Sequence, residues 1–184
     1  TRPDMPVRRH SPAGLDEDHL PGDFAIWIFI YAELLVFGIF FVAYAFARAR
    51  NVALFNQYQQ YVDRDIGAIN TLVLITSSLF VVRAVNAIKR GLGRLCSRWL
   101  ALAILCGGIF VALKLVEFGA KYEAGISLST NLFYMFYLSL TFFHFMHVLM
   151  GMTILGVVAA KAWRGGYAAR SHTGVETGAS YWHM

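Results

Sequence analysis

The chain has 184 residues, of which 58% are hydrophobic and only 15% are charged. Its mean hydropathy of +0.54 excludes an ordinary soluble domain of this length, because the surface of such a domain must be covered by polar residues. The formal net charge of +5 does not indicate nucleic-acid binding, because the basic residues lie in short connections between long apolar blocks. We therefore expect an all-α integral membrane helical bundle.

The chain begins with a polar stretch over residues 1–21, which contains all four prolines and no apolar periodicity. This composition indicates a flexible tail. Residues 22–184 then form one transmembrane helical domain. Its four spans are expected at about 24–47, 66–88, 99–118 and 131–160, because about twenty apolar residues suffice to cross the hydrocarbon core.

Glu33 is the only charged residue inside the first span. It lies about ten residues, or roughly 15 Å, into the helix, which places it near the middle of the bilayer. A lone carboxyl group at that depth should be protonated or paired. A proton relay, a contact between subunits, and a neutral carboxyl group hydrogen-bonded inside the bundle are all compatible with the sequence.

The second and third spans carry features that favour close helix packing. Thr76, Ser77 and Ser78 have small hydroxyl side chains, which are common where membrane helices meet. Lys114 and Glu117 lie three residues apart near the exit of the third span. That spacing allows the two side chains to pair on one helix face.

The fourth span, residues 131–160, runs thirty residues without Asp, Glu, Lys or Arg and carries His144 and His147 at its centre. Their spacing places both imidazoles on the same side of the helix. An H-x-x-H pair can bind a metal, but a closed zinc site needs about four ligands. Haem ligation requires histidines from facing helices. We therefore expect no metal, cofactor or catalytic site in this chain, and instead a hydrogen bond to Glu33, a lipid or a partner.

Beyond the fourth span, Glu176 and His183 lie seven residues apart and share a face if a helix runs through both. A glutamate and a histidine at a membrane boundary can bind a lipid head group or support a subunit contact. Ordinary anchoring at the interface is the plainer reading, which Tyr181 and Trp182 also suggest.

The orientation of the chain follows from its basic residues. The N-terminal tail and the connections at 89–98 and 161–170 fall on one side of the membrane and hold ten Lys and Arg, against four on the other side. The positive-inside rule therefore predicts a cytoplasmic N-terminus.

Several of these segments resemble subunit III of the haem–copper oxidases, including the subunit III-like accessory protein of nitric oxide reductase. The segment FFHFMHVLMG at 142–151 resembles the family's F-H-x-x-H-V-x-x-G segment. The segment GVETGASYWHM at 174–184 resembles its G-x-E-x-x-x-x-Y-W-H segment. The helix around Glu33 is similar to the family's buried glutamate helix, and Asn70-Thr71 matches an N-T-x-x-L pattern.

The resemblance covers about residues 22–184 and is to the short five-helix form, so that a fifth transmembrane helix is expected after Met184. The loop ISLSTN at 126–131 lacks the D-G-x-x-G-S pattern of typical cytochrome c oxidase members. This difference favours the branch associated with nitric oxide reductase.

The resemblance implies a cofactor-free accessory subunit of an oxidoreductase complex in the bacterial inner membrane. Haem and copper, or non-haem iron, are then expected in a catalytic haem-bearing subunit I-like partner. The family is associated with assembly, stability, lipid binding, and gas or proton access. Glu33 and His147 become candidates for a buried polar contact, whereas His144, Glu176 and His183 become candidates for contacts with phospholipids or a partner.

Two other functional classes remain in view. An independent small proton-coupled transporter could use Glu33 and the histidines, although the spans show no inverted repeat or helix break. A small b-type cytochrome is the weakest alternative, because both histidines of the spans lie on one helix.

Overall fold

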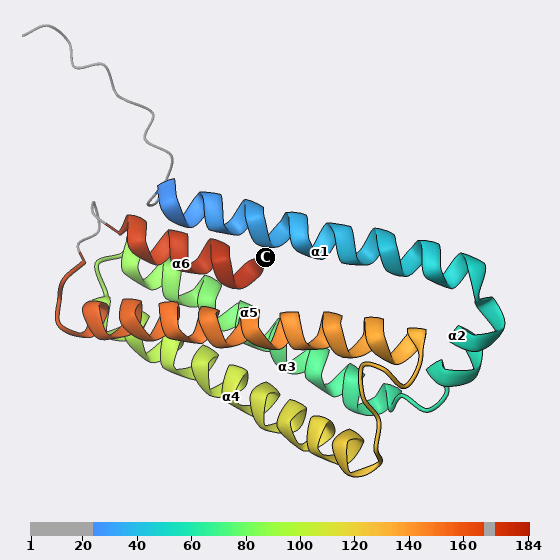
Figure 1. The fold of residues 1–184 in the computed structure, drawn as a ribbon. Coiled ribbons are helices and arrows are strands. Elements are labelled where there is room, and N and C mark those ends of the chain that lie inside the picture. Colours follow the sequence, from blue (N-terminus) through green and yellow to red (C-terminus); the bar gives the residue numbers. More distant parts are fainter. Residues whose placement is uncertain (1–23, 168–171) are drawn as a thin grey trace, which may run out of the picture.

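The computed structural model describes residues 24–167 and 172–184, and every element in these ranges is a helix. The expected tail at 1–21 lies outside the described residues. In chain order the helices are α1 (Phe24–Arg50), α2 (Val52–Gln59), α3 (Arg64–Lys89), α4 (Gly93–Glu123), α5 (Leu132–Trp163) and α6 (Thr173–His183) (Figure 1).

Four of the described helices, α1, α3, α4 and α5, are long and apolar enough to cross a membrane. The expectation of an all-α membrane bundle is therefore confirmed. The helices extend past the expected spans, most clearly α4, which begins at Gly93 and ends at Glu123. A helix of 31 residues is about 46 Å long, longer than the hydrocarbon core of about 30 Å. Its ends therefore reach the interface, where arginine and lysine side chains can extend to water.

Local signals in the sequence explain where the long helices begin and end. Asp63 precedes α3, and its side chain accepts hydrogen bonds from the backbone N–H groups of Asp65 at 3.0 Å and Ile66 at 3.2 Å. Such a cap satisfies N–H groups that have no partner inside the helix. Gly91, just beyond α3, has a φ of 75°, a left-handed conformation that glycine adopts without strain.

The tightly packed part of the bundle consists of α3, α4, α5 and α6. Small side chains such as Ala84, Ala103 and Ala159 are buried where these helices meet, so that the backbones approach closely. The hydroxyl group of Ser77 donates to the carbonyl of Ala103 at 2.9 Å, and that of Ser97 donates to the carbonyl of Ala159 at 3.0 Å. These bonds link α3 to α4 and α4 to α5.

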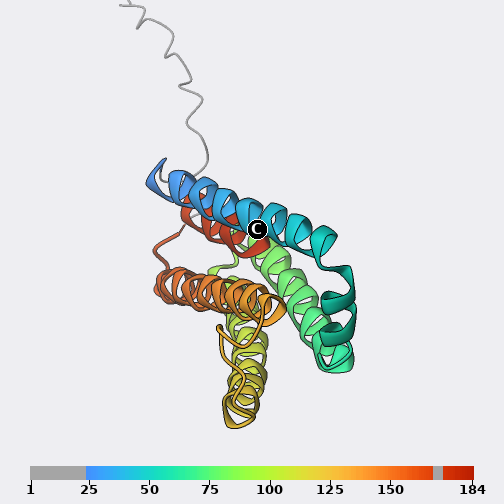
Figure 2. The same ribbon diagram turned by 45° about the vertical axis from the view of Figure 1, so that its right-hand side comes forward.

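Helix α1 is held more loosely than the others. It contacts α5 and α2, and Ile30 is its only buried residue. The two ribbon views show α1 along one side of the bundle, with α6 beside its N-terminal half and α4 on the opposite side of α5 (Figures 1 and 2). The contacts that join α1 to the bundle therefore determine whether it keeps this position.

An aromatic cluster joins the C-terminal half of α1 to α2 and α5. Phe55 of α2 is fully buried and meets Tyr44 of α1 and Phe133 of α5 edge to face, with ring centroids 5.4 and 5.6 Å apart. Edge-to-face pairs of this kind are favourable beyond the area they bury. This cluster holds the C-terminal end of α1, and a polar contact at Glu33 holds its N-terminal half.

Candidate functional site

A polar contact inside the bundle joins three helices. Glu33 of α1 lies against His147 of α5, with the carboxyl Oε2 2.7 Å from the imidazole Nδ1. Tyr181 of α6 donates its hydroxyl to the other carboxyl oxygen, Oε1, at 3.1 Å. Both oxygens of the Glu33 carboxyl group are therefore engaged by side chains that lie 114 and 148 residues away along the chain.

The surroundings of this contact are aromatic and largely closed. Tyr181 is fully buried and His147 is 7% exposed. Their rings stack with centroids 4.6 Å apart, Phe29 also stacks on Tyr181, and Phe37 meets His147 edge to face. This packing fixes the orientation of both rings and keeps Nδ1 of His147 directed at Glu33.

Glu33 and His147 share one proton in this geometry. Either the imidazole Nδ1–H donates to a carboxylate, or a carboxylic acid donates to the neutral Nδ1. Tyr181 acts as a donor in both cases. Because an unpaired carboxyl or imidazole group is costly at this depth, the three residues stabilise the position of α1 without any group from outside the chain.

Two glycines make room for the aromatic residues of α6. A Cβ atom at Gly151 of α5 would lie 2.8 Å from Cε3 of Trp182 and 3.4 Å from Cε1 of Tyr181. A Cβ atom at Gly107 of α4 would lie 3.0 Å from Cη2 of Trp182. The absence of side chains at these two positions therefore allows α6 to place Tyr181 beside Glu33.

Replacing Gly151 with alanine should displace Trp182 and Tyr181 and destabilise the chain by about 1–3 kcal/mol, as overpacking of a filled interior does. The control is Gly156→Ala on the same helix, where a Cβ atom meets nothing within 4 Å. Unfolding in mixed micelles with increasing dodecyl sulfate measures the difference. Equal midpoints for the two variants would contradict the close packing described here.

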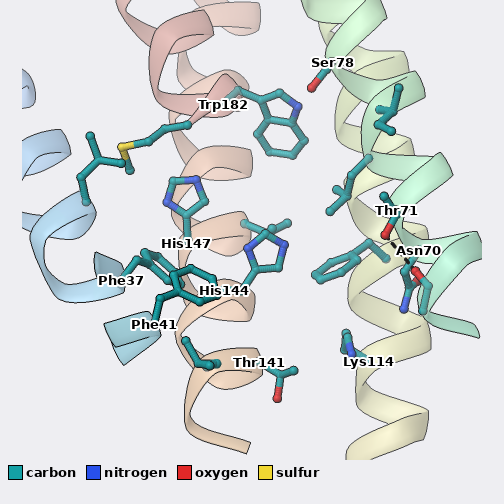
Figure 3. A pocket seen from close by; sticks show the side chains of 18 of the residues that line it. Phe37, Phe41, Asn70, Thr71, Ser78, Lys114, Thr141, His144, His147 and Trp182 are labelled. Carbon is teal, nitrogen blue, oxygen red and sulfur yellow. Dashed lines mark hydrogen bonds between the residues drawn. The ribbon is translucent and has the colours of Figure 1, made fainter. Parts of the chain in front are cut away.

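His144 lies on the same side of α5 as His147 but has different neighbours. Its ring meets Phe110 of α4 edge to face at 5.4 Å and lies 6.3 Å from the ring of His147. In the part of the chain that the structure describes, His144 makes no hydrogen bond, and it borders a cavity between the helices (Figure 3). The structure thus distinguishes two histidines that their spacing alone treats alike, and it has His147, not His144, against Glu33.

Glu176 and His183 lie at opposite ends of α6 and do not come together. Oε1 of Glu176 is 2.9 Å from Nζ of Lys89 and 3.3 Å from Nε2 of His172. Glu176 therefore links the start of α6 to the end of α3, and the hydrogen bond from Lys89 lowers the pKa of its carboxyl group below the ordinary 4.5. His183 is exposed, so that it remains accessible to a lipid or partner.

The lowered pKa of Glu176 gives a pH dependence of defined sign. A carboxyl group whose pKa is lower in the folded state stabilises the fold above its unfolded pKa and loses this contribution as the pH falls through the folded value. We expect wild type to exceed Glu176→Gln in stability above pH 4.5, by at most about 1 kcal/mol because the pair is partly exposed.

The measurement is the thermal midpoint of both proteins in detergent between neutral and acidic pH. The difference between them should shrink as the pH falls below 4.5. Lys89→Met serves as a second variant, in which the difference between Glu176 and its glutamine replacement should be smaller at neutral pH, because only His172 still pairs with Glu176. A difference that grows on acidification would contradict the assignment.

A second polar cluster, which the sequence indicated only in part, lies between α4 and α5. Lys114 pairs with Glu117 at 2.7 Å, as the spacing predicted. Glu117 also accepts a hydrogen bond from the hydroxyl of Tyr137 and lies 3.6 Å from Nζ of Lys121. The contact with Tyr137 carried no sequence signal, because it depends on how α5 is placed against α4, whereas Lys121 lies four residues after Glu117 on the same helix. Within residues 24–167 and 172–184, no group of three His, Cys, Asp or Glu residues has the geometry to hold a metal ion.

Comparisons with known proteins place the whole bundle in one family. Residues 21–184 match the family described as Cytochrome c oxidase subunit III. Cytochrome c oxidase subunit 3 of Thermostichus vulcanus is 32% identical over 174 residues, which cover 92% of this chain and 85% of the relative. The Synechocystis sp. protein of the same name is 30% identical and covered to 68%, and the Carassius auratus protein is 32% identical and covered to 45%. This chain therefore belongs to the cytochrome c oxidase subunit III family.

Proposed function

We propose that this chain is a non-catalytic accessory subunit that packs beside the catalytic, haem-bearing subunit I-like protein of a respiratory haem–copper oxidase. The observation that carries the proposal is the contact of Glu33, His147 and Tyr181. These polar groups partner one another and fix the position of α1, as expected of a residue set that supports a folded surface rather than performs a reaction.

The oxidase that this chain serves is proposed to be a cytochrome c oxidase, with haem and copper in the partner subunit. The names of the curated relatives support this choice. The loop at 126–131, which lacks a pattern common in cytochrome c oxidases, favours nitric oxide reductase instead. The relatives weigh more, because they match the chain over most of its length.

The proposed roles are assembly and stability of the complex, contact with phospholipids, and access of gas or protons to the catalytic subunit. The chain would lie in the bacterial inner membrane with its N-terminus in the cytoplasm. The connections that follow α3 and α5, with Lys89, Arg90, Arg94 and Lys161, lie on the same side as the N-terminus, and this side carries most of the basic residues. His144, Glu176 and His183 remain the candidates for contacts with lipid or partner.

The experiment is to purify the tagged chain in mild detergent, then record an optical spectrum and identify the accompanying proteins by mass spectrometry. We expect stoichiometric haem-bearing subunits, with a copper-containing oxidase among them. Recovery of a nitric oxide reductase would redirect the proposal to that complex. A colourless chain, isolated under conditions in which other respiratory complexes of the same membranes stay intact, would overturn it.

An independent proton-coupled transporter is the alternative, and one observation favours it. Glu33 contacts His147, and His147 and His144 both line the cavity with ring centroids 6.3 Å apart. In the transporter, these three groups would pass a proton along α5. Proton flux into liposomes that contain only this chain, abolished by Glu33→Gln, would support this function. An absence of flux in the wild-type chain would exclude it.

A further inference from the structure

Helix α6 joins two polar contacts that lie at different levels of the bundle. Near its start, Oε1 of Glu176 is 2.9 Å from Nζ of Lys89 at the end of α3. Near its end, the hydroxyl of Tyr181 donates to Oε1 of Glu33. Glu176 and Tyr181 are five residues apart, which corresponds to about 7.5 Å along the helix. One short helix therefore connects an ion pair at the surface with a carboxyl group inside the bundle.

The start of α6 is attached to its surroundings through Glu176. His172 precedes the helix without capping it by a side-chain hydrogen bond, and its Nε2 instead lies 3.3 Å from Oε1 of Glu176. Glu176 is the acidic residue of the first turn, where a negative charge is favourable. The charges that face Glu176 from the described residues, Lys89 and His172, thus determine how firmly this end of α6 is held.

The rest of α6 is packed closely against its neighbours. Its buried residues are Val175, Thr177, Gly178, Ala179 and Tyr181, and the helix contacts both α5 and α3. A Cβ atom at Gly178 would lie 3.4 Å from Cγ2 of Ile154 on α5, so that the backbones of the two helices lie near each other. Because close-packed interiors transmit strain, a shift at the start of α6 should reach Tyr181.

The contact between Tyr181 and Glu33 is sensitive to a small shift of α6. Its O···O distance of 3.1 Å already exceeds the usual range for this kind of hydrogen bond, and a further displacement of about 0.5 Å would break it. The contact of Glu33 with His147 joins α1 to α5. A shift of α6 therefore removes the hydroxyl of Tyr181 and leaves the other contact in place.

The hydroxyl of Tyr181 influences where the proton shared by Glu33 and His147 resides. A hydrogen bond donated to a carboxylate stabilises its charged form, so that Tyr181 favours a carboxylate beside an imidazolium. Without this bond, a carboxylic acid beside a neutral imidazole becomes more populated, while Nε2 of His147 keeps its own proton. Hydrogen bonds to charged groups are strong enough to change the ratio of these two forms by about tenfold.

We propose that α6 couples the ion pair of Lys89 and Glu176 to the position of the proton between Glu33 and His147. While Lys89 holds Glu176, Tyr181 donates to Glu33 and the proton on Nδ1 of His147 is favoured. When the ion pair is broken, α6 shifts, Tyr181 leaves Glu33, and the proton moves from Nδ1 to the carboxyl group. The net charge of the buried pair is the same in both forms. Salt that screens the surface ion pair is the signal to which this device responds.

The exposure of the ion pair limits the size of the coupling. The side chain of Lys89 is 51% exposed and that of Glu176 is 30% exposed, and pairs of this kind are weak. A contact can shift an equilibrium only by the free energy with which it distinguishes the two states. Breaking the ion pair should therefore change the ratio of the two proton positions by at most about fivefold, less than direct removal of the Tyr181 hydroxyl.

Infrared spectroscopy of the chain, purified in mild detergent with the subunits that accompany it, tests the proposal. A protonated carboxyl group has a carbonyl band that a carboxylate lacks, and the part of this band that disappears on adding Glu33→Gln in each background belongs to Glu33. We expect Tyr181→Phe to raise the Glu33 band most and Lys89→Met to raise it less. A Glu33 band that stays unchanged in either variant would overturn the proposal.

Arg90→Met is the matched control, because it removes the same charge from the neighbouring position, and Arg90 is not a partner of Glu176. It should leave the Glu33 band as in wild type. Added salt should raise the band in wild type, because screening weakens an exposed ion pair, and should have no such effect in Lys89→Met. An equal response to salt in the two proteins would contradict the coupling, whichever complex the chain belongs to.

Discussion

Replacing Glu33 with alanine should release α1 from its polar contact with the bundle and reduce the yield of assembled complex. The substitution leaves Nδ1 of His147 and the hydroxyl of Tyr181 without the partner they share. Each buried polar group that loses its partner costs about 1–3 kcal/mol, so that the two together cost about 2–6 kcal/mol. Because α1 has Ile30 as its only buried residue, little other packing compensates. Two quantities are measured: the accessibility to a thiol reagent of a cysteine introduced into α1, and the yield of haem-bearing partner that co-purifies.

Glu33→Gln is the control that separates structure from proton transfer. A glutamine amide can donate to a neutral Nδ1 of His147 while its oxygen accepts from Tyr181, so that both hydrogen bonds are kept. We expect normal assembly and nearly normal turnover of the complex. Normal assembly with a large loss of turnover would contradict the structural role and assign Glu33 to proton movement.

A third variant, Glu33→Leu with His147→Leu, removes both members of the closest pair. Replacing both partners by apolar groups avoids leaving a buried polar group unpaired. The double variant should therefore be more stable than Glu33→Ala, although Tyr181 still lacks an acceptor. The coupling between positions 33 and 147 follows from the thermodynamic cycle of single and double variants.

The sequence was sufficient to predict the class of fold and the depth of the polar groups. Long apolar blocks predict the four spans, and the level of Glu33 in the first span matches the level of His147 in the fourth. Spacing alone could not identify the histidine that contacts Glu33, because His144 and His147 lie on the same side of α5. The family resemblance named His147, and the structure has His147 against Glu33. The rotation of α5 that selects His147 is determined by packing between helices.

Tyr181 was harder to place for a related reason. It lies in a short final element, and its contact with Glu33 depends on the room left by Gly151 and Gly107. The cavity beside Asn70 was equally invisible in the sequence, since a void is defined by side chains from several helices at once. Local spacing did predict the Lys114–Glu117 pair, because both residues lie on one helix.

A second large loss of stability is expected from Glu117→Leu. This carboxylate is the common partner of Lys114, Lys121 and Tyr137, and its side chain is only 15% exposed. Removing it leaves Lys114, which is 8% exposed, as a buried charge without a counter-charge among the described residues. Breaking a buried ion pair in this way typically costs about 3–5 kcal/mol.

The double variant Lys114→Met with Glu117→Leu provides the matched comparison. It removes the buried charge together with its partner, and such apolar replacements are often neutral or stabilising when they pack well. Lys121 retains its position over the Tyr137 ring, 5.0 Å from the centroid, and lies nearer the end of α4, where its side chain can extend to water. We therefore expect the double variant to recover most of the stability that Glu117→Leu loses.

Unfolding in mixed micelles measures both variants on one scale, and the coupling energy between positions 114 and 117 follows from the cycle completed by Lys114→Met. The single variant Lys114→Met should cost less than Glu117→Leu, because Glu117 still has Lys121 and Tyr137. If Glu117→Leu were as stable as the double variant, Lys114 would have found another anionic partner. That result would contradict the role of Glu117 as the counter-charge on which the buried Lys114 depends.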